Sequence, residues 1–224
     1  MGSIATLGLL AILLAGAASA IAGEKAKNYD EMVLIPAGKF IYGKPGETKE
    51  ISLPAFSIDK YEVTNKQYAR FNLDHKYGKG GDNYPVTMVS INDAIAHCEA
   101  QDKRLPTEQE WEKAARGTDG RIYPWGNEFD KVLCITKETA PPEGGSSAII
   151  APVGSCEQGN SPYGVADMAG NVWEWTSSTD GRYNVLRGGS YFENRNFATV
   201  HTYLLTIPDD AKDYVGFRCA KDVK

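Results

Sequence analysis

The sequence is poor in the residues that most often build metal centres and nucleotide sites. Its 224 residues include three histidines, His75, His97 and His201, without HxxxH or HxE spacing, so a histidine metal centre would need distant loops. Neither GxGxxG nor GxxxxGK accompanies Gly188-Gly189, which argues against the common nucleotide-binding loops. The four cysteines form no CxxC pair, which argues against a zinc cluster.

Basic charge is also scarce. The chain has 24 Lys and Arg against 29 Asp and Glu, a net charge of -5, and no run of basic residues forms a stripe. A phosphate backbone would therefore have little to bind, and we expect no nucleic-acid partner. A hydrophobic content of 42% is ordinary for a globular protein and is sufficient for one sizeable core. We find no internal repeat.

The N-terminal segment lacks charge. No charged side chain occurs in residues 4–22, which end in Ala18-Ser19-Ala20, a pattern suited to signal peptidase. We expect residues 1–22 to be a cleaved signal peptide or a retained single membrane anchor, 23–31 a short linker and 32–224 one domain. The protein would then be exported, to the periplasm or the extracellular space, or anchored to the membrane, with membrane contact only through residues 1–22. An even cysteine count fits such an oxidising compartment.

Three helices and several short strands are predicted. Thr64, Ser90 and Thr107 each precede an apolar pattern of helical period and can cap a helix. "MVLIPAGKFIYG" and "ISLPAFSIDKYEV" indicate strands joined by turns. After Arg121 no helical period persists, and residues 140–147 resemble a surface loop. The pattern predicts an α+β fold with little regular secondary structure and long ordered loops.

The segment "DMAGNVWEW", residues 167–175, carries a candidate calcium site. Asp167 and Glu174 are hard carboxylate ligands, and Gly170 lets the chain turn so that backbone carbonyls face the same point. In a strand, Trp173 and Trp175 would lie on one face and Glu174 on the other. In the alternative interpretation, Asp167 caps a turn, Glu174 pairs with an arginine and the tryptophans are core residues.

Eight ordered motifs resemble the formylglycine-generating enzyme family, also called the sulfatase-modifying factor domain. The similarity runs from about Met32 to Lys221. The motifs are "MVLIPAGKF", "FSIDKYEVTNKQYARF", "PVTMVSINDAIAHCEAQDKRLPTEQEWEKAARG", "YPWGNE", "APVGS", "SPYGVADMAGNVWEWTSS", "VLRGGSYF" and "VGFRCA". The resemblance implies a variant of the C-type lectin fold, in agreement with the α+β prediction.

The resemblance also implies pairings and ligands. Family members join the cysteines that match Cys98 and Cys219, which would leave Cys134 and Cys156 for a second bridge. One family calcium site matches Asp167, Gly170, Val172 and Glu174, so calcium is the expected cofactor. The other family site would fall at Cys134 and near Gly145, which supply no side-chain oxygen, so we expect it to be lost.

The copper site of the family is not matched. Enzymes that make formylglycine bind copper through two cysteines, whose positions hold Glu193 and Ala198 in this chain. Copper and formylglycine-generating activity are therefore not expected. We expect a noncatalytic binding or accessory subunit with a protein partner in the cell envelope or a membrane complex. The alternative is an oxidoreductase of nonheme-iron or siderophore-maturation type, whose candidate residues are Glu193, Ser190, Tyr191, Arg195 and His201.

Overall fold

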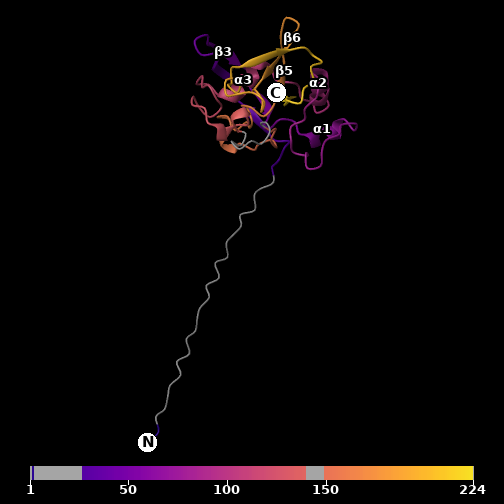
Figure 1. The fold of residues 1–224 in the computed structure, drawn as a ribbon. Coiled ribbons are helices and arrows are strands. Elements are labelled where there is room, and N and C mark those ends of the chain that lie inside the picture. The colour runs from indigo at the N-terminus through magenta and orange to yellow at the C-terminus, as the bar shows by residue number, and fades with distance from the viewer. Residues whose placement is uncertain (1, 3–26, 140–148, 224) are drawn as a thin grey trace.

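Short strands and three helices alternate with long loops in the computed structural model, which describes residues 2, 27–139 and 149–223 (Figure 1). The strands are β1 (Met32–Ile35), β2 (Gly38–Tyr42), β3 (Lys49–Leu53), β4 (Phe56–Asp59), β5 (Trp173–Asp180), β6 (Tyr183–Arg187), β7 (Tyr203–Thr206), β8 (Val215–Gly216) and β9 (Ala220–Asp222). The helices are α1 (Asn65–Phe71), α2 (Ile91–Glu99) and α3 (Glu108–Arg116), with 3-10 turns η1 (Lys131–Leu133), η2 (Lys137–Thr139) and η3 (Glu157–Gly159).

All three predicted helix starts are confirmed. Thr64, Ser90 and Thr107 each accept a hydrogen bond from the backbone N–H three residues on, and the side chain at that position accepts one in return from the capping N–H. These capping boxes satisfy N–H groups that the first helical turn leaves without partners. Helix formation here is therefore specified by residues close together in the chain.

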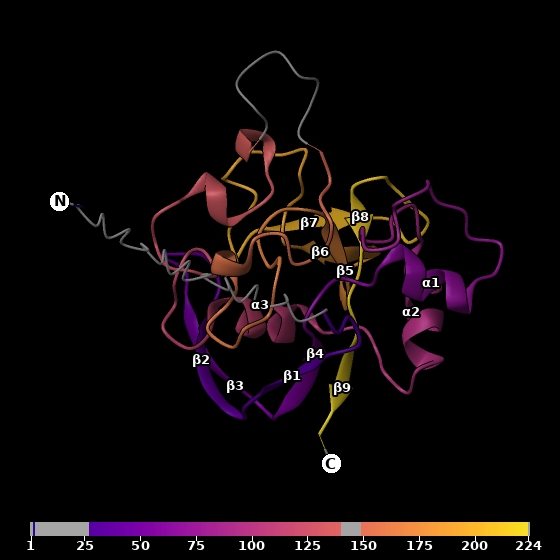
Figure 2. The same cartoon turned by 90° about the horizontal axis from the view of Figure 1, so that it is seen from below.

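The strands form three small sheets with the orders β1-β4-β9, β2-β3 and β7-β6-β5-β8. All pairs are antiparallel except β5 and β8. The β2–β3 hairpin lies at one side of the molecule, α1 and α2 lie at the other, and α3 lies between them (Figure 2). The predicted α+β fold class is confirmed.

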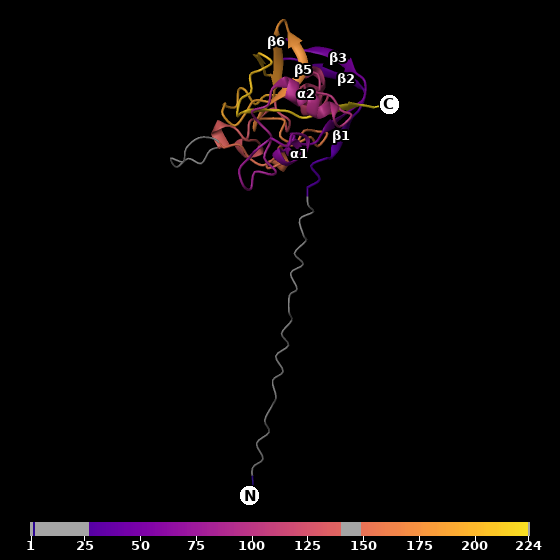
Figure 3. The ribbon, with the colours of Figure 1, turned by 90° about the vertical axis from the view of Figure 1, so that its right-hand side faces the viewer.

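Two apolar clusters form most of the core. One joins Trp173 and Trp175 of β5 to Phe217 and to α2, the helix that faces the viewer in Figure 3. The other surrounds Trp111 of α3. Glu174 lies on the opposite face of β5 from the two tryptophans, as the alternation predicts, and its buried carboxylate accepts a hydrogen bond from the Trp111 indole at 2.7 Å.

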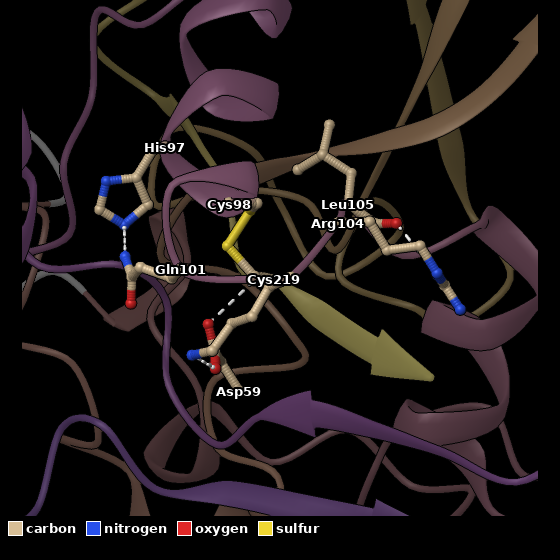
Figure 4. The surroundings of a disulfide bond; sticks show 8 residues. Asp59, His97, Cys98, Gln101, Arg104, Leu105 and Cys219 are labelled. Atoms are coloured by element: carbon tan, nitrogen blue, oxygen red, sulfur yellow. Dashed lines mark hydrogen bonds and ion pairs between the residues drawn. A yellow bond between two sulfur atoms is a disulfide. The ribbon is translucent and has the colours of Figure 1, made fainter. Parts of the chain in front are cut away.

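The Cys98–Cys219 disulfide is confirmed, and it joins α2 to the segment between β8 and β9 (Figure 4). Both cysteines are fully buried. Asp59 lies beside the bridge, where it accepts hydrogen bonds from the Cys219 N–H at 3.1 Å and from the Lys103 ammonium at 2.7 Å. The bridge fixes two segments that are 121 residues apart.

The expected second bridge is absent, because Cys134 and Cys156 are free thiols in this structure. They follow η1 and precede η3, two turns that pack together, but the Cys134 sulfur contacts the Asp130 carbonyl at 3.8 Å and lies in a small apolar cluster. Burial raises the pKa of Cys134 to about 12 and that of Cys156 to about 11. No S–S bond joins the two cysteines, although Cys156 is near enough to raise the pKa of Cys134 further.

The predictions for residues 1–22 and 140–147 lie outside the described residues, apart from residue 2. In the part of the chain that the structure describes, no helix is long and apolar enough to cross a membrane.

Candidate functional site

The loop after β6 carries the positions that correspond to the family copper site. Gly188 and Gly189 have φ of 103° and 74°, which disfavour residues with a side chain. A Cβ at Gly189 would lie 2.6 Å from the Phe197 carbonyl oxygen, so only glycine permits this close approach. The glycine pair thus brings the start of the loop against residues 197 and 198.

Glu193 is held by two hydrogen bonds. Its Oε2 accepts from the hydroxyl of Ser190, which is buried, and its Oε1 accepts from the Trp173 Nε1 at 3.2 Å. The backbone carbonyl of Glu193 accepts from the Lys137 N–H at 2.9 Å. The side chain therefore ties the loop to β5 and uses both carboxylate oxygens in doing so.

Ala198 is buried in a small apolar cluster. Its neighbours there are Cys134 and Ala169, and Trp125 and Phe129 pack against them. Of the four cysteines, Cys134 thus lies closest in packing to this position, and its raised pKa keeps the thiol protonated at neutral pH. Neither position 193 nor position 198 provides a thiolate.

Tyr191 and Arg195 of the same loop have separate partners. The Tyr191 N–H donates to the Asn171 carbonyl at 2.9 Å, and burial raises the pKa of its phenol. Arg195 forms an exposed ion pair with Glu138 at 3.3 Å, and its guanidinium lies 4.4 Å from the centre of the Phe129 ring. Neither contact forms a catalytic arrangement with Glu193.

His201 lies in a different environment from Glu193. Its Nε2 is 3.3 Å from the Thr199 hydroxyl, and the ring faces a groove beside the β2–β3 hairpin. No hydrogen bond or ion pair among the described residues joins His201 to Glu193. The carboxylate and imidazole that the oxidoreductase alternative requires are therefore not brought together.

Glu174 pairs with an arginine, as in the alternative to the calcium interpretation. Arg218 donates to both of its oxygens, from Nε and Nη2, each at 2.7 Å, and the Trp111 indole donates to Oε2, also at 2.7 Å. All three side chains are fully buried. Such a bidentate pair satisfies the carboxylate without a metal ion.

Asp167 has a second buried carboxylate beside it that sequence reasoning missed. Asp167 has φ of 58°, and its Oδ2 accepts from the Gly154 N–H at 2.5 Å. Glu62 is 1% exposed, and its Oε1 accepts from the Asn171 amide at 2.9 Å, while its Oε2 has no partner. The signal in the sequence was an acidic residue between two apolar ones, Tyr61 and Val63.

The electrostatics of this buried pair favour a cation. Burial, and then the nearby Asp167 carboxylate, raise the pKa of Glu62 well above its usual range, and burial also raises the pKa of Asp167. Arg218 directs its hydrogen bonds to Glu174 and to backbone carbonyls, not to this pair. Within the described residues, no three His, Cys, Asp or Glu side chains converge as a metal site, so calcium here would need backbone or solvent oxygens as well.

The chain is similar to known proteins over most of its length. The model of the sulfatase-modifying factor enzyme 1-like domain matches residues 18–223. The inactive C-alpha-formylglycine-generating enzyme 2 of Bos taurus is 31% identical, over 84% of this chain and 87% of that protein. The formylglycine-generating enzyme of Mus musculus is 27% identical, over 93% of this chain and 79% of that protein.

Solved structures share the fold. PvdO from Pseudomonas aeruginosa has a TM-score of 0.73 and 21% identity, over 88% of this chain and all of that one. CarF has a TM-score of 0.70 and 22% identity, over 87% of this chain and 98% of that one. At such identities the likeness concerns the fold alone. Because the family match extends over nearly the whole chain, this protein belongs to the family of the sulfatase-modifying factor enzyme 1-like domain.

Proposed function

We propose that this chain is a noncatalytic member of its family that acts as a binding or accessory subunit. The observation that carries the proposal is the pair of positions 193 and 198. Copper(I) selects soft thiolates, whereas Glu193 offers hard oxygens already used in hydrogen bonds and Ala198 offers a buried methyl group. The relatives named inactive formylglycine-generating enzyme 2, from Bos taurus and Mus musculus, support it.

A copper titration under reducing conditions tests the lost metal site. We expect no stoichiometric, tight binding by the wild-type chain. The double variant Glu193→Cys/Ala198→Cys, which adds both thiols, is the matched comparison. Tight binding of one copper ion by the wild-type chain would contradict the proposal.

We propose that the protein acts as an accessory subunit outside the cytoplasm. The buried Cys98–Cys219 disulfide is compatible with export, since such bridges persist in oxidising compartments. Loops on a rigid base can present a surface to a protein of the cell envelope or of a membrane complex. Copurification from native membranes tests this role: a stoichiometric partner is expected, and a lone monomer would contradict it.

Calcium is the proposed cofactor, with a ligand set that differs from the one implied by the family. The carboxylate of Glu174 accepts hydrogen bonds from Arg218 and Trp111. Glu62 and Asp167 lie side by side, and among the described residues they accept hydrogen bonds from an amide and a backbone N–H but from no lysine or arginine side chain. We assign the carboxylate ligands to Glu62 and Asp167. Calcium there would replace the proton that the raised pKa of Glu62 retains, and it would fix the segment before β5 to the segment after β4.

Thermal unfolding with calcium and with a chelator tests this assignment. We expect calcium to raise the melting temperature of the wild-type chain but not that of Glu62→Gln. Asp59→Asn is the matched control, because Asp59 is also a buried carboxylate but pairs with Lys103 at 2.7 Å. A calcium effect that survives in Glu62→Gln, or that Asp59→Asn abolishes equally, would overturn the assignment.

A further inference from the structure

A groove of about 660 Å³ lies beside the β2–β3 hairpin, and of the candidate site residues in the loop after β6 only His201 lines it. The hairpin supplies one wall, the end of β6 supplies the floor, and the start of β7 with the preceding segment supplies the other wall. The residues that matter for its chemistry are Tyr42, Lys44, Lys49, Arg187, His201 and Tyr203.

Two buried guanidinium groups lie in and behind the floor. Arg187 donates to Glu112 at 3.0 Å and to Glu108 at 2.7 Å, and Arg116 donates to the other oxygen of Glu112 at 2.8 Å. Arg187 is 1% exposed, and Arg116 and Glu112 are fully buried. Two guanidiniums therefore share the central carboxylate, and only Glu108 adds a second negative charge to this network.

Among the described residues, three buried nitrogen atoms in or next to the groove have no hydrogen-bond partner. They are the Nε of Arg187, the Nη2 of Arg116 and the Nδ1 of His201. A buried donor without a partner is unfavourable and uncommon in folded proteins. The two arginine N–H groups indicate a shortage of acceptor oxygens in and behind the floor, and the His201 Nδ1 adds a third donor in the tautomer that carries its proton there.

The rim adds two lysines without counter-ions. In the described chain neither Lys44 nor Lys49 forms an ion pair, although Glu47 also lines the groove. Lys49 Nζ lies 5.3 Å from the centre of the Tyr42 ring. Together with Arg116 and Arg187, the two lysines give four positive charges against the three carboxylates of Glu47, Glu108 and Glu112, a small positive excess on a chain with a net charge of -5.

An exposed aromatic ring completes the groove. Tyr203 is 54% exposed, and the Arg187 guanidinium lies 5.7 Å from the centre of its ring. The guanidinium holds the inner side of the ring, so its outer side is available to an organic ligand. The positively charged groups of the groove and the apolar ring face of Tyr203 therefore lie next to each other.

We propose that this groove binds a small ligand through an oxyanion group, with the Lys44 and Lys49 ammoniums as direct contacts, the buried Arg187 as the fixed positive charge behind them and Tyr203 against the ligand body. Carboxylate, sulfate and phosphate share the required chemistry, because each presents several acceptor oxygens with negative charge. The site includes neither Glu193 nor Ala198, the positions that match the family copper ligands, nor the proposed calcium ligands. Its test is therefore independent of those two proposals.

Titration of the full chain with inorganic phosphate, sulfate and acetate, at constant ionic strength set with chloride, tests the proposal. We expect saturable binding of at least one anion, a shift of the His201 imidazole signals in NMR spectra, and a loss of affinity of about tenfold or more in Lys44→Gln/Lys49→Gln. The preferred anion distinguishes a tetrahedral from a planar group.

Lys39→Gln is the matched control, because Lys39 lies on the same hairpin but pairs with Glu50 at 2.7 Å. It should bind as the wild-type chain does. Both rim lysines are exposed, so circular dichroism should show that the double variant keeps its fold. Absence of saturable binding, unchanged affinity in the double variant, or an equal loss in Lys39→Gln would overturn the proposal.

Discussion

Glu193 is a structural residue in this chain, since it links its own loop to Ser190 and to the Trp173 indole. Glu193→Ala removes both hydrogen bonds, and we expect it to lower the free energy of unfolding by about 2 kcal/mol. Glu193→Gln keeps an acceptor for Trp173, so its free energy of unfolding should decrease by less. Urea unfolding of the three proteins measures the difference. An alanine variant as stable as the wild-type chain would show that these contacts are unimportant.

His97 is a buried residue that makes stability depend on pH. It is 1% exposed and stacks on Tyr68, and burial, with a smaller effect of Lys103, lowers the pKa of His97 to about 4. In the unfolded chain a histidine titrates near ~6.5. Between these values the unfolded chain binds the proton and the folded chain does not, so stability is full above ~6.5 and falls as pH decreases toward 4.

The loss attributable to His97 over this window is about 3 kcal/mol at most. The slope of the unfolding free energy against pH gives the number of protons taken up on unfolding. In His97→Gln this number should be smaller by about one, whatever the absolute stability of the variant. Unfolding measured at several pH values between ~4 and ~7 gives this slope. An unchanged slope would mean that His97 titrates normally in the folded chain.

At the scale of elements, Thr107 stabilises the start of α3, the helix that carries Trp111, Glu112 and Arg116. The Glu110 N–H donates to the Thr107 hydroxyl at 3.2 Å, and the Thr107 N–H donates to the Glu110 carboxylate at 2.8 Å. Thr107→Ala should lower stability by about 1 kcal/mol, whereas Thr107→Ser should have little effect. Thermal unfolding distinguishes them, and equal losses in both variants would argue against a capping role.

The helices could be predicted because their signals are local. Each cap and its partner lie three residues apart, and Trp111 follows with the expected period. The candidate site could be predicted only in part, because its contacts are distant in the chain. Glu62 and Asn171 are 109 residues apart, and Glu174 and Arg218 are 44 apart. No local pattern marks such pairs.

At the scale of the whole molecule, one buried disulfide constrains the chain. The double variant Cys98→Ala/Cys219→Ala removes a bridge between residues that are 121 positions apart in the sequence. The chain-entropy estimate for this change is a decrease of roughly 4 to 5 kcal/mol in the free energy of unfolding. Cys134→Ala/Cys156→Ala, which removes two free thiols, is the matched control and should lose less. Denaturant unfolding compares them, and a larger loss in the control would contradict the assigned pairing.

The central claim is that the family scaffold is kept in this molecule while its copper chemistry is lost. Its most direct test is mass spectrometry of a sulfatase-derived cysteine peptide after incubation with the copper-treated chain, oxygen and a reductant. The formylglycine-generating enzyme of Mus musculus is the positive control. The account predicts an unmodified cysteine with this chain and an aldehyde with the control; an aldehyde formed by this chain would contradict it.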